Sequence, residues 1–223
     1  MKRLRPPDIR PLEIWDAKVA GRPLFEWQSS DEFPSALEVL VDQLRREHRF
    51  ARVHLLGGGA LAPGLAQRLS ASVAADPVFS AARAGGALYG ACADVGQTAI
   101  KVVAAGAAML CARDHEQAPL HGARESTLAF LARSLAPLRS SRSYLLALPC
   151  ALGDGPALSE CTYAWQPGDL PGLLRAARLD PAGAWLVNDA ELAALSWAHD
   201  PRAAPERTLV LTIGFGVGAA LWR

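Results

Sequence analysis

The chain has 223 residues, enough for one large domain or two small ones, and a formal net charge of +1 from 23 basic and 22 acidic side chains. Hydrophobic residues make up 51% and charged residues 20%, which excludes a disordered chain, and no apolar run is long enough for a transmembrane helix. The balanced charge gives no general attraction to nucleic acid or to an anionic membrane, so we expect neither as a partner.

The start of the chain and the cysteines indicate a cytoplasmic protein. The basic residues 1–7 are followed by Asp8 and Arg10 in place of an apolar core, so this segment is not a signal peptide. Four cysteines are widely spaced: Cys92, Cys111, Cys150 and Cys161. No Cys-x-x-Cys pair occurs among them, which favours reduced thiols packed as small apolar residues over a disulfide or zinc framework.

The first fifty residues predict a loose arm, a hairpin and a helix. Residues 1–10 are expected as the arm, and two short aromatic-bearing runs at 12–15 and 23–27 predict a β-hairpin with Gly21 in or near its turn. A helix is expected from about residue 29 to residue 46, because Pro34 fits its first turn and apolar residues recur at helical spacing.

Three adjacent glycines, Gly57, Gly58 and Gly59, follow a predicted strand at 53–56, and a helix is expected at 63–69. The glycines thus lie at a strand-to-helix turn, where backbone N–H groups are free to meet a ligand such as a nucleotide. A flexible turn without a ligand is the alternative. Residues 80–90 are rich in small side chains, which predicts either a closely packed helix or a loose linker.

An acidic residue, a glycine and a hydroxyl residue occur together at Asp94, Gly96 and Thr98, just before an apolar segment. This pattern predicts a tight turn at the start of a strand. Gly96 allows the backbone to approach a ligand, Thr98 offers an N–H and a hydroxyl to a phosphate oxygen, and Asp94 is suited to hold a hydrated Mg²⁺. A hairpin turn without a ligand is the alternative.

From residue 93 onward, predicted strands alternate with helices, which is typical of an α/β protein with mixed sheets. The expected strands are 99–105, 107–113, 144–148, 185–187, 207–213 and 219–222, and the expected helices are 124–138, 170–177 and 190–198. The first two of these strands form a hairpin that turns near Gly106. Functional residues in such a fold are expected at the ends of the strands.

Two further segments carry candidate chemistry. Asp189 lies at a strand-to-helix junction, where its carboxylate is placed to accept the proton of a substrate hydroxyl that attacks phosphorus. Capping of the helix by Asn188 or Asp189 is the structural alternative. Gly214, Gly216 and Gly218 predict a hairpin turn whose N–H groups come close to a second phosphate.

These segments, in this order, resemble the sugar kinases of the ROK family, within the superfamily of actin, hexokinases and heat-shock chaperone ATPases. Residues 94–98 with Lys101 are similar to the first phosphate motif of the family, and 211–218 are similar to the second. Residues 187–195 resemble the segment that bears the catalytic aspartate. Residues 146–150 resemble a strand ending in Pro-Gly, with Pro149 kept and Cys150 in place of the glycine.

The resemblance implies a two-lobed actin-like ATPase fold, which is ribonuclease H-like and α/β with mixed sheets, and ATP and Mg²⁺ as cofactors. It implies phosphoryl transfer to a hydroxyl of a small molecule, such as a sugar, with Asp189 as general base and Asp94 organising Mg²⁺. The implied nucleotide contacts are Gly96, Thr98, Lys101, Gly214, Gly216 and Gly218 for the phosphates and Gly57, Gly58 and Gly59 for adenosine. The implied substrate contacts are Asn188, Pro149 and Cys150.

The order of the motifs predicts a circular permutation. In the family, a glycine-rich adenosine motif and an alanine-rich helix follow the second phosphate motif, whereas the similar segments here, 53–59 and 84–90, precede the first. Residues 1–90 and 207–223 are therefore expected to form a shortened second lobe, and 91–206 the first lobe. Such rearrangement is physically permitted because chain termini usually lie at the surface and often close together.

A permuted single chain predicts that residues 219–222 share a sheet with residues 12–27, so that Trp222 and Arg223 lie near them. The alternative is that residues 1–90 complete the cleft of a neighbouring subunit in a homodimer.

Departures from the family favour a second hypothesis, a non-catalytic regulatory relative that binds a nucleotide or a sugar. The sugar-binding Gly-Glu-x-Gly-His segment and the cysteine-rich zinc site have no counterpart, and Cys150 replaces a glycine. His115 and His121 are expected in a polar loop rather than a metal site.

Overall fold

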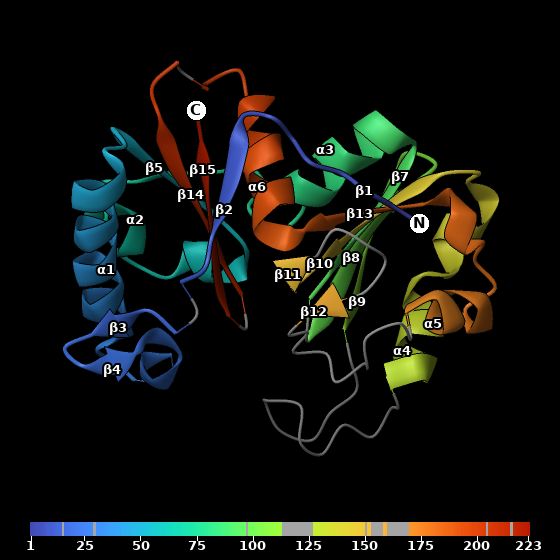
Figure 1. Cartoon of the computed structure of the whole chain (residues 1–223), viewed down its shortest axis with the longest axis horizontal. Coiled ribbons are helices and arrows are strands. Elements are labelled where there is room, and N and C mark those ends of the chain that lie inside the picture. Colours follow the sequence, from blue (N-terminus) through green and yellow to red (C-terminus); the bar gives the residue numbers. More distant parts are fainter. Residues whose placement is uncertain are drawn as a thin grey trace.

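The computed structural model describes residues 1–14, 16–28, 30–96, 98–112, 127–149, 151–152, 158–159, 170–203, 205–214 and 216–223. Within these residues the chain forms two larger β-sheets with helices between and around them (Figure 1). The predicted α/β class with mixed sheets is confirmed, because each large sheet contains both parallel and antiparallel pairs.

The first large sheet has six strands. Their order across the sheet is β1 (Lys2–Arg3), β13 (Ala184–Asn188), β10 (Tyr144–Leu148), β7 (Ala91–Val95), β8 (Ala99–Ala104) and β9 (Ala107–Ala112). The first four strands run parallel, and β7, β8 and β9 form an antiparallel meander. The predicted hairpin with its turn near Gly106 is confirmed.

The second large sheet has five strands. Their order is β2 (Ile9–Leu12), β15 (Val217–Trp222), β14 (Thr208–Ile213), β5 (Arg52–Leu56) and β6 (Ser72–Val73). Strands β2, β15 and β14 form an antiparallel meander, and β5 and β6 run parallel to β14. The order and directions are the same as in the series β9, β8, β7, β10, β13 of the first sheet.

The two ends of the chain meet in this second sheet. Trp222 pairs with Ile9, and the backbone N–H of Arg223 donates a hydrogen bond to the carbonyl oxygen of Asp8 at 3.0 Å. The expectation that residues 219–222 share a sheet with residues 12–27 is confirmed only at its edge, because they pair with residues 9–12 of the same chain, whereas residues 18–23 form a separate two-stranded sheet. In the first sheet the three meander strands β7, β8 and β9 follow one another in the sequence. In the second sheet only β14 and β15 are consecutive, and the N-terminal strand β2 supplies the third strand.

Two expectations for the first thirty residues are wrong. Residues 1–10 are not a loose arm, because they contain β1, which pairs in the first sheet, and the first half of β2, which pairs in the second. The expected hairpin of 12–15 and 23–27 is reduced to β3 (Lys18–Val19) and β4 (Arg22–Pro23), with Gly21 in the turn at a φ of +82°. The part after β4 is a 3-10 helix, η1 (Leu24–Trp27).

Six α-helices and three further short 3-10 helices belong to the described residues. The α-helices are α1 (Phe33–His48), α2 (Leu65–Arg68), α3 (Ser80–Tyr89), α4 (Thr127–Ser134), α5 (Leu170–Ala176) and α6 (Asp189–Ala198). The 3-10 helices are η2 (Gly58–Leu61), η3 (Ala136–Ser140) and η4 (Pro181–Gly183). Residues 124–126 of the predicted helix 124–138 lie outside the described residues, and its last part is η3 instead of α-helix.

Helix α6 lies between the two sheets (Figure 1). Its side chains Ala190, Leu192 and Trp197 belong to one apolar core together with Val187 of the first sheet and Val210 of the second. Two other cores complete the layers: α4 and α5 cover the opposite face of the first sheet, and α1 and α2 cover the opposite face of the second. The helix that begins at Asp189 is thus fixed by both sheets.

The remaining described strands, β11 (Ala151–Leu152) and β12 (Leu158–Ser159), form a small antiparallel pair. None of the helices in the described ranges combines the length and the apolar character that crossing a bilayer requires.

Candidate functional site

The carboxyl ends of three parallel strands bring the predicted residues to one edge of the first sheet. In the register of this sheet, Ala147 of β10 pairs with both Asp94 and Val187, and Leu148 pairs with Asn188. Asp94, Pro149 and Asn188 therefore lie at the same edge, as expected for functional residues at strand ends. Cys150, the other predicted substrate contact, lies outside the described residues.

Asn188, and not Asp189, caps helix α6. The Asn188 side chain accepts a hydrogen bond from the Ala190 N–H at 3.0 Å, and the Asn188 N–H donates to Oε2 of Glu191 at 3.0 Å. The Asn188 side chain also accepts from the N–H of Glu191, and this bond together with the one to Oε2 of Glu191 forms a capping box. Asp189 is the first residue inside the helix, and its Oδ1 accepts from the Ala190 N–H at 2.8 Å.

Asp94 is held by a lysine on the neighbouring strand. Asp94 and Lys101 are cross-strand partners in β7 and β8, and Nζ of Lys101 lies 2.9 Å from Oδ2 of Asp94. Both side chains are largely buried, with 14% and 19% of their surface exposed. The Asp94 carboxylate raises the pKa of Lys101, so the ammonium group stays charged.

Strand alternation directs Asp94 toward α6. Ala93 and Val95 face the core with α4 and α5, whereas Cys92 faces the core that contains α6, and successive side chains of a strand point to opposite faces. Asp94 shares the face of Cys92 and interacts electrostatically with Asp189.

The pKa of Asp189 is raised to about 7, first by burial and then by the negative charge of Asp94. The N–H of Ala190 and the positive charge of Lys101 oppose this rise. A carboxyl group with a pKa near the working pH is effective as a general base, because it is partly deprotonated and still accepts a proton readily.

The second glycine hairpin approaches Asp189 from the other sheet. Gly214 donates a hydrogen bond to the carbonyl oxygen of Gly216 at 2.9 Å, which closes the predicted hairpin turn between β14 and β15. A Cβ atom at Gly218 would lie 2.6 Å from Oγ1 of Thr212 and 3.6 Å from Oδ1 of Asp189. Only glycine fits this close approach between β15 and the start of α6.

The glycines after β5 contact the same hairpin. Gly57 has a φ of +86°, and a Cβ atom there would collide with the carbonyl oxygen of Ile213, while one at Gly59 would collide with the Ile213 side chain. A Cβ at Gly58 would meet no atom within 4 Å. Packing against Ile213 therefore explains two of the three glycines, and it brings all three next to the turn that begins at Gly214.

The segment that contains Gly96 and Thr98 is the turn between β7 and β8. The Gly96 N–H donates to the carbonyl oxygen of Ala99 at 3.0 Å, and a Cβ at Gly96 would lie 2.7 Å from that oxygen and 3.6 Å from Nζ of Lys101. The segment thus forms a hairpin turn between two antiparallel strands. Its contact with a phosphate group stays a prediction. Gln97 and Phe215 lie outside the described residues.

Two residues near Asp189 were not predicted from the sequence. Glu191 is buried, with 3% of its surface exposed, and pairs with Arg3 of β1 at 3.1 Å. The spacing of Asn188 and Glu191 is the sequence signature of a capping box and could have identified Glu191. No local signal connects Arg3 to it, because 188 positions separate the two.

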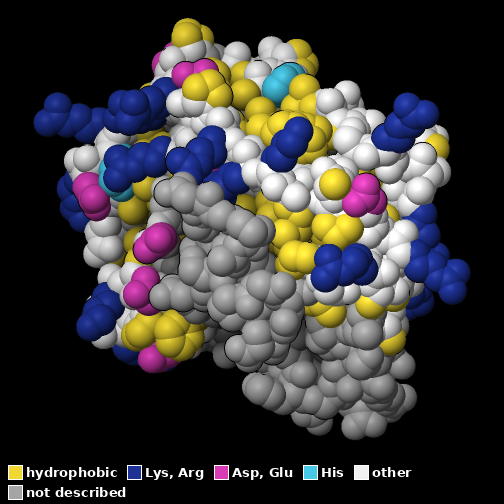
Figure 2. All heavy atoms as spheres, turned by 45° about the vertical axis from the view of Figure 1, so that its right-hand side comes forward, with side chains coloured by type: hydrophobic (Ala, Val, Ile, Leu, Met, Phe, Trp, Pro, Cys, Tyr) yellow, Lys and Arg dark blue, Asp and Glu magenta, His cyan; other side chains and the backbone are white. Residues whose placement is uncertain are grey.

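The described residues contain no group of three or more His, Cys, Asp and Glu side chains placed to hold a metal ion. His115, His121 and Cys161 lie outside the described residues, whereas Cys92 and Cys111 are buried free thiols, as predicted for them. On the face shown in Figure 2, Lys and Arg side chains are spread among acidic ones rather than gathered in one patch.

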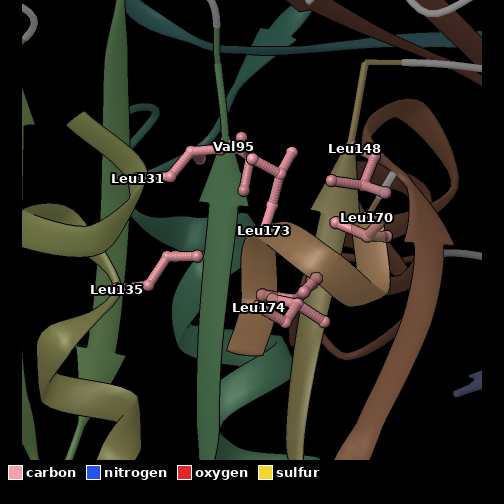
Figure 3. Close-up of a pocket in the computed structure, with 8 residues that line it drawn as sticks. Val95, Leu131, Leu135, Leu148, Leu170, Leu173 and Leu174 are labelled. Atoms are coloured by element: carbon pink, nitrogen blue, oxygen red, sulfur yellow. The ribbon is translucent and has the colours of Figure 1, made fainter. Parts of the chain in front are cut away.

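Two hollows in the described part of the chain have linings that do not include Asp94, Lys101 or Asp189. The smaller, about 10 Å³, lies between the first sheet and helices α4 and α5 and has an apolar lining that includes Val95, Leu135 and Leu174 (Figure 3). Its lining offers no polar partner to a bound water molecule. The larger, about 500 Å³, lies between β2 and α1, and its lining includes Arg10 and Gln43.

Comparisons of the chain with protein-family models, with curated proteins and with solved structures gave no match.

Proposed function

We propose that this chain is an ATP-dependent kinase that transfers phosphate to a hydroxyl group of a small molecule, with Asp189 as general base. The observation that carries the proposal is the position of Asp189 next to Gly218, which follows the second glycine hairpin. The charges of Asp94 and Lys101 act on Asp189, and Lys101 lies next to Gly96 in the turn of the first hairpin. Phosphoryl transfer depends mainly on positioning and charge stabilisation, which such an arrangement provides.

The repeated strand order supports an actin-like two-lobed fold for this kinase. Each large sheet contains an antiparallel meander followed by two parallel strands. Each meander also carries a glycine turn, at Gly96 between β7 and β8 and at Gly214 between β14 and β15. The similarity of the motifs to ROK-family sugar kinases and the N-terminal origin of β2 support a circularly permuted version of that fold.

Each residue of the cluster has a proposed role. Asp189 accepts the proton of the attacking hydroxyl, so it must be deprotonated when the acceptor binds. Lys101 is placed to donate to a phosphate oxygen, and the turns at Gly96 and Thr98 and at Gly214, Gly216 and Gly218 offer N–H groups to the phosphates.

Asp94 fits a magnesium site that is shared with phosphate. Its carboxylate is the kind of oxygen ligand that Mg²⁺ takes, and Mg²⁺ commonly binds through one or two carboxylates plus phosphate oxygens. The ion supplies neutralisation of the phosphate charge. Lys101 now pairs with Asp94, so it has to share or release that carboxylate when the ion binds.

The adenosine side is proposed at Gly57, Gly58 and Gly59, beside Ile213 and the second hairpin. Gly58, which has open space around it, is the most accessible of the three. The acceptor is proposed to bind beside Pro149 and Asn188, which share the sheet edge with Asp94. A sugar or a sugar derivative is the class that the family resemblance favours.

The ion pair between Lys101 and Asp94 favours one alternative, a non-catalytic nucleotide- or sugar-binding relative with a regulatory role. A carboxylate already neutralised by a lysine 2.9 Å away has less need of a metal ion. In that case the two hairpins bind a ligand without turnover.

Calorimetry with Mg²⁺ and ATP, followed by ATP consumption against a panel of sugars, tests the proposal. We expect ATP to bind to the wild type and to Asp189→Asn with similar affinity, and turnover to fall by about 10² to 10⁴ in the variant, the range for a lost general base. Asp42→Asn, an exposed carboxylate on α1, is the matched control. Unchanged turnover in Asp189→Asn would reject the proposed base, and binding without turnover of any sugar would favour the alternative.

A further inference from the structure

The N-terminal strand reaches the helix that carries Asp189. Strand β1 pairs in parallel with β13, and Leu4 donates a backbone hydrogen bond to the carbonyl oxygen of Leu186 at 2.7 Å. This pairing places Arg3 beside the start of α6, where its Nη2 atom lies 3.2 Å from Oε1 and 3.1 Å from Oε2 of Glu191.

Glu191 connects Arg3 to the first turn of α6. The same Oε2 atom that faces Arg3 accepts the hydrogen bond of the Asn188 N–H. Asn188 in turn accepts from the Ala190 N–H and donates toward the carbonyl oxygen of Leu148 at the end of β10. Asp189 lies between the two residues of this capping box, so its backbone is fixed on both sides.

The burial of the ion pair argues that it is more than a surface contact. Glu191 is almost fully buried, and 16% of the Arg3 side chain is exposed. Burying two charges is costly, and the cost is offset only by good geometry and additional hydrogen bonds. Nε and Nη1 of Arg3 are buried with no hydrogen-bond partner among the described residues, so this cost is not offset on the arginine side. The pair is therefore better explained by the position it gives to Glu191 than by a gain in stability.

Holding β1 on the sheet does not require this pair, because the backbone hydrogen bonds to β13 already do so. We propose that Arg3, acting through Glu191, is a positioning residue that fixes the first turn of α6 and thereby the direction of the Asp189 carboxylate. This role rests on the proposed function of Asp189. The N-terminal strand then becomes part of the phosphoryl-transfer site without touching the substrate.

The test compares Arg3→Met, which removes the charge and keeps the apolar length, with Arg3→Lys and with Arg52→Met. Arg52 forms an exposed ion pair with Glu206 and serves as the control, because neither residue of that pair belongs to α6 or to the group around Asp189. Two quantities are measured in the full chain: kcat and KM for Mg²⁺-ATP turnover, and hydrogen exchange of the amides at 188–192 and in α1.

We expect Arg3→Met to lower kcat about tenfold or more, as small misplacement of a reacting group does, with KM for ATP within about twofold of wild type. Amides at 188–192 exchange faster, and those of α1 do not change. Arg3→Lys restores most of kcat, and Arg52→Met behaves as wild type. We expect Glu191→Gln, whose side-chain oxygen still accepts the hydrogen bond of the Asn188 N–H, to lower kcat and to speed exchange at 188–192 as well. This variant replaces Arg3→Met if Arg3→Met does not fold.

An Arg3→Met variant whose kcat and whose exchange at 188–192 both equal those of the wild type would overturn the proposal and leave Arg3 a structural residue. If the wild type shows no ATP turnover but Arg3→Met still exchanges faster at 188–192, the proposed kinase function fails and the positioning of the helix start by Arg3 stands.

Discussion

Asp189, in the first turn of α6, is subject to opposing electrostatic effects on its pKa. Burial and the carboxylate of Asp94 favour its neutral form, and the Ala190 N–H and the Lys101 ammonium group favour the charged form. Burial and the Asp94 charge outweigh the other two effects, so the pKa of Asp189 is raised to about 7. A phosphate group that draws Lys101 toward itself, or a Mg²⁺ that neutralises Asp94, therefore changes how readily Asp189 accepts a proton.

This raised pKa predicts a pH-dependent effect of Asp189→Asn on stability. Between the ordinary pKa near 4 and the folded value of about 7, the folded state binds a proton that the unfolded state has lost, so this group's contribution to stability decreases as pH rises through that window. The variant removes the buried charge that the wild type carries above the window. We expect it to gain stability relative to wild type at about pH 8 compared with about pH 4.5 in urea unfolding.

Asp42→Asn is the control, because this exposed carboxylate on α1 pairs with Arg45 at the surface. The same stability difference between Asp189→Asn and wild type at both pH values would mean that Asp189 titrates normally in the folded protein.

At the scale of elements, glycines allow the second hairpin to pack against its neighbours. Ile213, just before the turn, is contacted by the segment of Gly57 and Gly59, and Gly218 after the turn faces Thr212 and Asp189. The close contacts leave no room for a Cβ atom at these positions. The hairpin is thereby held against both the end of β5 and the start of α6.

Gly57→Ala tests this packing. The variant has to accommodate a φ of +86° and a collision with the Ile213 carbonyl group, and we expect it to lower the free energy of unfolding by about 3 kcal/mol. Gly64→Ala is the matched control, because Gly64 also has a positive φ, +75°, but no atom within 4 Å of an added Cβ, and we expect a loss of about 1 kcal/mol. Equal losses of the free energy of unfolding in urea would show that the contact with Ile213 does not affect stability.

Strong local patterns predicted most elements correctly. The predicted bounds of β5, β10 and β14 agree with the structure within one residue, because their side chains are apolar and buried. The apolar periodicity also predicts α1, which ends two residues later than expected and begins four residues later, at Phe33. The early hairpin was misjudged because β2 contains Arg10 and Pro11 and has little apolar signal of its own. Its partner is β15, more than 200 positions away, and such pairing leaves no local trace.

At the scale of the whole molecule, two sheets of the same strand order enclose α6 (Figure 1). The sequence predicted Asn188 and Asp189 at a strand-to-helix junction, and the structure confirms this. Asp94 was expected in a turn before a strand, but it lies within β7, a strand that was not predicted from the sequence. The register of the folded sheet brings Asp94 and Asn188 to a common edge. The ion pair of Arg3 with Glu191 could not be predicted, because only the folded sheet brings β1 beside β13.

We propose that the phosphates of the nucleotide bind between the two glycine hairpins. The most direct test is a crystal structure with Mg²⁺ and a non-hydrolysable ATP analogue. We predict phosphates in contact with the turns at Gly96 and at Gly214 and Gly216, with the terminal phosphate facing Asp189. A nucleotide bound instead in the hollow between β2 and α1, or phosphates that touch neither hairpin, would exclude this binding site.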